Sequence, residues 1–299
     1  MKAIFHEGYI LMMPDDNMMP DDKNSARPIL SVQNVTRIYR SRSFLFARDD
    51  QGVTAVSDVS LDVNRGEVFG LVGGSGSGKT TLGRLILRLE RPDVGDIRFE
   101  GESVGGLRGS SLKAFRRKMQ MIPQDPYQSL NPYFSIYDTV AEPLVIHGIG
   151  DDEGRRELVR KALDSCGLSP AQDYYSRYPH QLSGGQRQRA AIARAMVLDP
   201  DFVIADEPTS MLDASISFSI FRLLSKIRKK QRVTFLFITH DLAAARFFCD
   251  RIAVIRQGRL VETGPTLEII ENPQHEYTKA LIAAQPRFSF AVKPESVSS

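Results

Sequence analysis

The sequence predicts an α/β fold in which a mostly parallel sheet is covered by helices on both faces. After Pro200, the strand-like runs DFVIADEP, VTFLFITH and RIAVIRQG alternate with the helical runs ASISFSIFRLLSKIRKKQ and DLAAARFF. Such alternation builds parallel strands that are connected by helices. Earlier in the chain, the short apolar run EVFGLV leads through the glycine-rich stretch GGSGSGKT into a helical run. This is again the order strand, loop, helix.

Two blocks depart from the alternation. Near the N-terminus, ILSVQNVTRIY and AVSDVSLDV have strand patterns and are separated by RSRSFLFARDDQG, which predicts an antiparallel pair with a long hairpin loop at about 40–52. From about 127 to 190 the hydrophobic period is helical, which predicts an inserted α-helical subdomain. Between these blocks, GDIRFEG predicts an edge strand and MQMIP a short buried strand.

The composition narrows the class of protein. Hydrophobic residues make up 42% and charged residues 25%, as in ordinary globular domains. The 39 basic and 36 acidic residues leave a net charge of +3, which argues neither for nor against nucleic acid. Cys166 and Cys249 are too few for a disulfide framework or a four-ligand metal site, and we expect each to be a small buried residue. Since no apolar run approaches the ~18 residues of a membrane span, we expect a protein that is not integral to a membrane.

Residues 1–28 differ from the rest of the chain. The segment MMPDD occurs twice, at Met12–Asp16 and Met18–Asp22. The acidic, proline-bearing repeat predicts a disordered leader. It has neither the long apolar segment nor the small-residue cleavage site of a signal peptide.

The stretch GGSGSGKT matches the phosphate-binding pattern G-x-x-x-x-G-K-[ST] in full and follows a predicted strand. Glycines let successive backbone amides surround phosphate oxygens, the lysine reaches the β and γ phosphates, and the final threonine hydroxyl can ligate Mg²⁺. The predicted ATP-binding residues of this loop are Gly73, Gly74, Ser75, Gly76, Ser77, Gly78, Lys79, Thr80 and Thr81.

Polar side chains stand at the ends of three other predicted strands. Asp206 and Glu207 end DFVIADEP, His240 ends VTFLFITH, and Gln124 follows MQMIP. Because ligands bind beyond the carboxyl ends of parallel strands, we expect these residues near the phosphates. Asp206 is assigned to Mg²⁺ and Glu207 to the attacking water; the alternative is a helix-capping pair of acids. His240 is also compatible with a capping or core role, and Gln124 with an ordinary loop residue.

The stretch QLSGGQRQR begins another predicted helix. Ser183 and Gln186 have the spacing of a capping box, but the box does not explain Gly184 and Gly185, which are poor helix formers. A helix N-terminus with bare backbone donors is also an anion site, so both interpretations stay open. Tyr39 similarly could stack on adenine or pack on the sheet.

Together these segments, from Ile29 to Pro286, resemble the nucleotide-binding domain of ATP-binding-cassette (ABC) proteins. The resemblance implies a P-loop NTPase (RecA-like) core with an antiparallel β subdomain and an inserted α-helical subdomain, spanning 29–265. It also implies ATP and Mg²⁺ as cofactors, with Thr80, Gln124 and Asp206 at the metal. The corresponding family elements are Walker A (Gly73–Thr80), the Q-loop (Gln124), the signature (Leu182, Ser183, Gly184, Gly185 and Gln186), Walker B (Phe202–Asp206), the catalytic glutamate (Glu207), the D-loop (SMLD, ending at Asp213) and the switch histidine (His240).

In that family two such domains dimerise head to tail, and the signature of one acts in trans on the ATP that the other holds. Hydrolysis, with Glu207, His240 and Gln124 as the implied catalytic residues, reopens the dimer. A membrane partner responds through a groove beside the Q-loop.

A closer resemblance is to the ATPase subunits of oligopeptide and dipeptide importers, a group that includes nickel and oligosaccharide systems. The segments QDPYQSLNP, RYPHQLSGGQRQR, DEPTSMLDASI and ENPQHEYTKALIAAQP carry it, although HEY replaces the usual HPY. The resemblance implies two membrane-spanning permease subunits and a second ATPase subunit, either a related sister subunit or a second copy of this chain. It also implies a solute-binding protein that acts indirectly, and a peripheral location on the cytoplasmic face of the membrane. Residues 266–299 would form the C-terminal helical extension and tail of this subfamily.

The main alternative is a soluble ABC ATPase that acts on DNA or ribosomes. DNA-repair members carry long coiled coils between Walker A and the signature, whereas the segment here has no sustained heptads. Translation-type members usually hold two cassettes in one chain, and this chain has one, so no nucleic-acid partner is expected. A degenerate cassette that binds ATP without hydrolysing it is disfavoured by Glu207 and His240.

Overall fold

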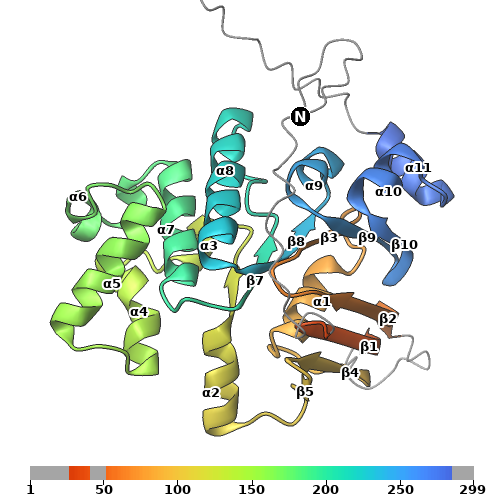
Figure 1. Ribbon diagram of the computed structural model, residues 1–299, viewed down its shortest axis with the longest axis horizontal. Coiled ribbons are helices and arrows are strands. Elements are labelled where there is room, and N and C mark those ends of the chain that lie inside the picture. Colours follow the sequence, from red (N-terminus) through yellow and green to blue (C-terminus); the bar gives the residue numbers. More distant parts are fainter. Residues whose placement is uncertain (1–26, 41–51, 285–299) are drawn as a thin grey trace, which may run out of the picture.

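The computed structural model describes residues 27–40 and 52–284. Within these ranges a six-stranded sheet lies between an antiparallel sheet on one side and a group of helices on the other (Figure 1). The predicted leader, apart from residues 27 and 28, and most of the predicted hairpin loop lie outside the described residues.

The larger sheet has the strand order β10-β9-β3-β8-β7-β6. Its central strands β3, β7 and β8 are buried on both faces, and β3, β6, β7, β8 and β9 run parallel. The predicted parallel sheet is therefore confirmed, with one addition: β10 pairs antiparallel with β9. The strands are β3 (Val68–Val72), β6 (Met119–Ile122), β7 (Phe202–Asp206), β8 (Thr234–Thr239), β9 (Arg251–Arg256) and β10 (Arg259–Pro265).

The smaller sheet is antiparallel, with the order β2-β1-β4-β5. The predicted edge strand is β4, which is internal only at Arg98 and Phe99, where the two-residue strand β5 pairs with it. The predicted strand MQMIP is β6, which forms the outer strand of the larger sheet and buries Met119 and Ile122. The strands are β1 (Leu30–Tyr39), β2 (Val53–Val63), β4 (Val94–Phe99) and β5 (Glu102–Ser103).

Helices follow the strands of the larger sheet or form the helical group to one side. In Figure 1 the helices α3 to α7 form a group to the left of β7, and α10 and α11 lie near β9 and β10. Among the described residues no helix is both long and apolar enough to cross a membrane. The helices are α1 (Lys79–Ile86), α2 (Gly109–Lys118), α3 (Pro126–Ser129), α4 (Ile136–His147), α5 (Asp152–Ser165), α6 (Gln172–Tyr175), α7 (Gly184–Met196), α8 (Ala214–Gln231), α9 (Leu242–Phe248), α10 (Thr266–Glu271) and α11 (Glu276–Ala283).

Two hydrophobic cores lie on opposite faces of the larger sheet. Alternate residues of β8 belong to different cores. Phe235 and Phe237 face the core on the helical side. Leu236 and Ile238 face the core that is shared with α1 and the antiparallel sheet. This alternation follows from the period of a strand, and it explains why the predicted runs are apolar throughout. Cys166 and Cys249 are buried as predicted, and burial raises the pKa of the Cys166 thiol to about 12.

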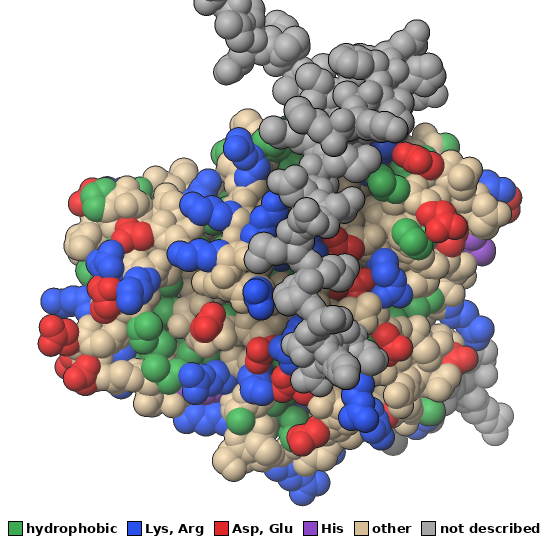
Figure 2. Space-filling model, viewed as in Figure 1, with side chains coloured by type: hydrophobic (Ala, Val, Ile, Leu, Met, Phe, Trp, Pro, Cys, Tyr) green, Lys and Arg blue, Asp and Glu red, His purple; other side chains and the backbone are tan. Residues whose placement is uncertain are grey.

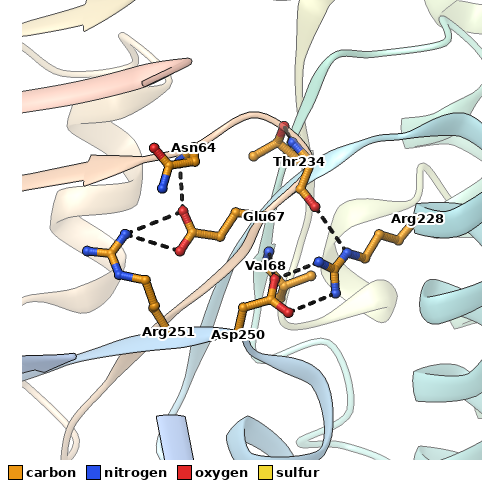
Figure 3. A network of polar contacts seen from close by, with 8 residues as sticks. Asn64, Glu67, Val68, Arg228, Thr234, Asp250 and Arg251 are labelled. Atoms are coloured by element: carbon orange, nitrogen blue, oxygen red, sulfur yellow. Dashed lines mark hydrogen bonds and ion pairs between the residues drawn. The ribbon is translucent and has the colours of Figure 1, made fainter. Parts of the chain in front are cut away.

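A polar network fixes the amino ends of the central strands (Figure 3). Arg228 of α8 binds Asp250 with both terminal nitrogens, at 3.2 and 2.6 Å, and its Nε donates to the Gly66 carbonyl at 3.1 Å. Asp250 also accepts from the Val68 amide at 2.8 Å. Beside this pair, the buried Glu67 accepts from Arg251 at 3.1 Å. These contacts hold α8, β3 and β9 in register at the edge opposite the carboxyl ends of the strands.

Charges of both signs cover the face shown in Figure 2. Lys and Arg side chains are interspersed there with Asp and Glu, as the near balance of acidic and basic residues predicts.

Asp250→Ala is expected to lower the free energy of unfolding by about 1–3 kcal/mol, because it removes the pair with Arg228 and the acceptor of the Val68 amide. Urea unfolding of the full chain measures this. Asp250→Asn keeps one acceptor and should cost less. If Asp250→Ala were no more destabilising than alanine at the exposed Asp152, the network would not hold the strands.

Candidate active site

The predicted site residues come from neighbouring strands. The phosphate loop follows β3, His240 follows β8, Asp206 ends β7, and Gln124 lies two residues beyond β6. Since the strand order is β3-β8-β7-β6 and these strands are parallel, their carboxyl ends meet along one edge. The strand order thus brings together residues that are far apart in the sequence.

The phosphate loop curls tightly and is closed by Lys79. The Lys79 Nζ donates to the carbonyls of Gly73 and Gly74 at 2.8 and 2.9 Å, and the side chain is almost fully buried. Gly78 has a φ of +104°, and a Cβ there would strike the Ala55 carbonyl oxygen. Only glycine fits that position. Ser75 and Gly76 remain exposed at the mouth of the loop.

Three polar side chains converge on Glu207. Gln124 Nε2 donates to Glu207 Oε2 at 3.0 Å, His240 Nδ1 lies 3.1 Å from Glu207 Oε1, and Lys79 Nζ lies 3.8 Å from the same oxygen. The Glu207 side chain is only 14% exposed, so its two oxygens are held in place rather than left in solvent. Of the predicted catalytic residues, the structure therefore groups Glu207, His240 and Gln124, together with Lys79.

The backbone of Glu207 is left-handed, with a φ of +43°. This conformation is uncommon for a residue other than glycine, and such strain is typical of functional sites. The Glu207 amide still donates to the Ile238 carbonyl at 2.9 Å, which extends the pairing of β7 with β8 by one residue. The turn directs Glu207 away from the buried position of Asp206.

Asp206 lies on the other side of the site, beside Thr80. Burial raises the pKa of Asp206, while a hydrogen bond from Thr80 and the charge of Lys79 act in the opposite direction. Among the described residues, Asp206 Oδ1 is buried without a hydrogen-bond partner. Burial likewise lowers the pKa of Lys79, against the opposing charges of Glu207 and Asp206. Both groups would gain from a bound ligand that supplies opposite charge.

The signature residues do not join this group within the chain. Ser183 caps α7: its Oγ accepts from the Gln186 amide at 3.3 Å, and Gln186 Oε1 accepts from the Ser183 amide at 3.0 Å. The predicted capping box is therefore present. Leu182 is buried, whereas Ser183 is exposed.

Packing explains one of the two signature glycines. A Cβ on Gly185 would lie 2.8 Å from Ile216 Cγ2 of α8, too close for any larger residue. A Cβ on Gly184 would make ordinary contacts, 3.4 Å from the Leu212 side chain. Packing within this chain therefore does not require glycine at 184, and the anion-site interpretation stays open.

Among the described residues, Tyr39 and Asp213 make no hydrogen bond or ion pair with Glu207, Gln124 or Lys79. The Tyr39 hydroxyl donates to Glu90 at 2.7 Å, and the Arg37 guanidinium lies over its ring at 5.0 Å. Tyr39 ends β1 opposite Val53, near the Ala55 carbonyl that approaches the phosphate loop, so stacking on adenine stays a prediction. Asp213 is exposed at the start of α8.

Three residues that the sequence did not single out, one arginine and two tyrosines, make contacts at the predicted motifs. Arg187 of α7 lies over the ring of Tyr127, 4.0 Å from its centre, which connects the segment after Gln124 to the signature helix. Tyr277 of α11 accepts a hydrogen bond from the Gly74 amide. The only signal for either tyrosine was its place in the subfamily segments QDPYQSLNP and ENPQHEYTKALIAAQP.

Known proteins resemble this chain in sequence and in fold. The sequence pattern of the ABC transporter family matches residues 56–210, and the pattern described as the oligopeptide/dipeptide transporter C-terminal region matches residues 261–296. The chain is 48% identical over 261 residues to the oligopeptide transport ATP-binding protein OppF of Streptococcus mutans, with 87% of this chain and 82% of that protein covered. It is 48% identical over 236 residues to OppF of Bacillus subtilis, with 78% and 77% covered.

A solved structure has the same fold. It is the ATP-binding cassette MJ0796, described as dimeric, in a post-hydrolysis state and bound to ADP and Pi. The TM-score is 0.70 at 30% identity, and the match covers 79% of this chain and 98% of that chain.

Asp206→Asn is expected to raise the free energy of unfolding at pH 7 by about 1 kcal/mol, the usual size of a single stabilising substitution. Burial raises the pKa of this carboxyl, so the folded protein favours the protonated form, and stability is lost as the pH rises through the unfolded and then the folded pKa. Asparagine does not ionise and avoids that loss of stability. The difference in the free energy of unfolding between the variant and wild type should therefore shrink toward pH 4. Urea unfolding of both proteins at pH 7 and at pH 4 measures this difference. A variant less stable than wild type at pH 7 would show that Lys79 and Thr80 outweigh burial.

Proposed function

Because this chain belongs to the ABC transporter family and is an ATPase, we propose that it is the ATP-hydrolysing subunit of an importer that carries oligopeptides or dipeptides across a membrane. The observation that carries the transport assignment is the match of residues 261–296 to the oligopeptide/dipeptide transporter C-terminal region. The relatives named for oligopeptide transport support it, since each is 48% identical to this chain.

We propose that residues 73–81 hold the phosphates of ATP. In the structure, Lys79 Nζ is bonded to two loop carbonyls and lies 3.8 Å from Glu207. A phosphate oxygen would compete with these partners and would restore the charge balance that burial has disturbed on Lys79. The exposed Ser75 and Gly76 leave the loop open to the nucleotide. Tyr39 would stack on the adenine.

The same site fits Mg²⁺. In nucleotide sites this ion is bound by one or two carboxylates together with substrate phosphates. The buried Oδ1 of Asp206, which lies next to Thr80 and has no hydrogen-bond partner in the described part of the chain, is a suitable donor. We propose that Asp206, Thr80 and the amide oxygen of Gln124 hold the ion or its waters. When bound, it would neutralise charge that develops on the transferred phosphoryl group.

Glu207 is proposed to orient and deprotonate the attacking water. Gln124 fixes one oxygen of the Glu207 carboxylate and His240 fixes the other. Because the carboxylate is already oriented, it can accept the proton of the water without a further loss of conformational freedom. The water oxygen bonds to the γ-phosphorus, the bond from that phosphorus to the bridging oxygen breaks, and ADP and phosphate leave. His240 would contact the γ-phosphoryl group, and the charge of Lys79 would stabilise it.

A second cassette would complete the site. Ser183 and Gly184 lie at the start of a 13-residue helix, away from the Glu207 group, and the capping box leaves the Ser183 side chain exposed. We propose that they act in trans on the ATP of a partner ATPase, with Asp213 at the contact between the two. The partners would be a related sister subunit, two membrane-spanning permeases and, indirectly, a solute-binding protein. The chain would then be peripheral, on the cytoplasmic face of the membrane.

Glu207→Gln is expected to leave ATP affinity within about twofold of wild type but to slow hydrolysis by at least about 100-fold, the low end of a general base's contribution. Phosphate release by the assembled transporter measures the rate. Cells in which this variant replaces the wild-type chain should lose uptake of a labelled tripeptide. Normal hydrolysis would contradict the role of Glu207. Lost hydrolysis with normal peptide uptake would contradict the transport assignment.

Ser183→Ala is expected to leave the ATP affinity of the isolated chain nearly unchanged and to reduce hydrolysis by the assembled transporter by roughly 100-fold, as for loss of a donor to a developing charge. The matched control is Ser135→Ala, since Ser135 caps α4 in the same way and its Oγ accepts from the Asp138 amide at 3.0 Å. Both variants lose an N-cap, which costs ~1 kcal/mol. An equal loss of hydrolysis in both would reduce Ser183 to a structural cap.

A further inference from the structure

Helix α11 contacts the phosphate loop through Tyr277. The Gly74 amide donates to the Tyr277 hydroxyl at 3.0 Å, across 203 positions of sequence. The Arg256 guanidinium lies over the Tyr277 ring, 4.9 Å from its centre, and the ring packs at the margin of the larger core. The tyrosine is therefore held by its ring and by its hydroxyl at once.

The segment that carries Tyr277 is anchored to the sheet. Glu262 of β10 accepts from the amides of Gln274 and His275 at 2.8 and 3.1 Å. His275 Nδ1 then accepts from the Tyr277 amide at 3.0 Å, which caps the start of α11. These bonds fix the place where α11 begins, so the Tyr277 hydroxyl is presented to the loop from a fixed base.

Both backbone polar groups of Gly74 are bonded, each to a different side chain. Its carbonyl accepts from Lys79 Nζ at 2.9 Å, and its amide donates to Tyr277. When Lys79 turns to a phosphate, the first bond is lost and the second remains. The Tyr277 bond can therefore preserve the shape of the loop during the exchange. A Cβ on Gly74 would lie only 3.2 Å from the hydroxyl, so the contact is close as well as polar.

We propose that Tyr277 is a positioning residue for the phosphate loop, which it preforms for nucleotide by holding the Gly74 amide. The proposal rests on the nucleotide-binding role of this loop. It gives the C-terminal segment, which matches the oligopeptide/dipeptide transporter region, a physical connection to the ATP site. Because coupling between two sites is reciprocal, nucleotide binding must also stabilise the position of α11.

The first test is the affinity of the full chain for ADP, measured by calorimetry. Tyr277→Phe removes one oxygen and keeps the ring under Arg256. We expect its affinity to fall by roughly 3- to 10-fold, the effect of losing one hydrogen bond. In the assembled transporter the KM for ATP should rise by a similar factor, while the rate at saturating ATP changes less than about twofold, because the loop is correctly shaped once ATP is bound.

The matched control is Tyr175→Phe. The Tyr175 hydroxyl also bonds to the backbone, although as a donor: it donates to the Arg156 carbonyl at 3.3 Å, in the helical group. This variant should bind ADP like wild type. If Tyr277→Phe binds ADP as tightly as wild type, or if Tyr175→Phe loses as much affinity, the proposal is overturned. In either case hydrolysis and peptide uptake by the wild-type transporter would be unaffected, so the proposed function would stand.

The second test is amide hydrogen exchange in α11. In the wild-type chain, saturating ADP should slow exchange across residues 276–283, and in Tyr277→Phe this added protection should disappear. A merely structural role of the hydroxyl would change exchange equally with and without ADP. Equal ADP-dependent protection in both proteins would overturn the coupling.

Discussion

The rest of the site depends on the contacts that fix the Glu207 carboxylate. Gln124, His240 and Lys79 reach it from segments that follow three different strands, and a left-handed residue aims it at them. None of these contacts could form if the order of β3, β8, β7 and β6 differed. The carboxyl ends of these strands must therefore be held in the right relative positions. The parallel sheet, its two cores and the polar network at its amino edge hold them there.

The same arrangement supports the proposal that this site binds a nucleotide. Lys79 and Asp206 are both buried, and burial disfavours the charge on each. A phosphate near Lys79 and a cation near Asp206 would supply the missing opposite charges, so binding relieves a cost that the folded chain already carries. The signature lies elsewhere, at the exposed start of α7. The proposed division of the site between two cassettes rests on that separation.

Local patterns predicted the sheet, the phosphate loop and the strand-end residues, because each depends on periodicity or on spacing within a short segment. Contacts between distant segments escaped prediction. The close approach of Gly185 to Ile216, the stacking of Arg187 on Tyr127 and the bond from Gly74 to Tyr277 all require the tertiary fold. The antiparallel β10 escaped for another reason: its residues are only partly buried, so the run lacks a clear apolar pattern. For Tyr39, position alone does not distinguish stacking on adenine from packing.

The most direct measurement is a structure of the assembled protein with Mg²⁺ and a non-hydrolysable ATP analogue. The account predicts that Lys79 Nζ leaves at least one of the Gly73 and Gly74 carbonyls for a phosphate oxygen. It also predicts that Glu207, still bonded to Gln124, faces a water next to the γ-phosphorus, and that the signature of a second cassette covers that phosphate. A γ-phosphate bound away from Glu207, with Lys79 still on both carbonyls, would contradict it.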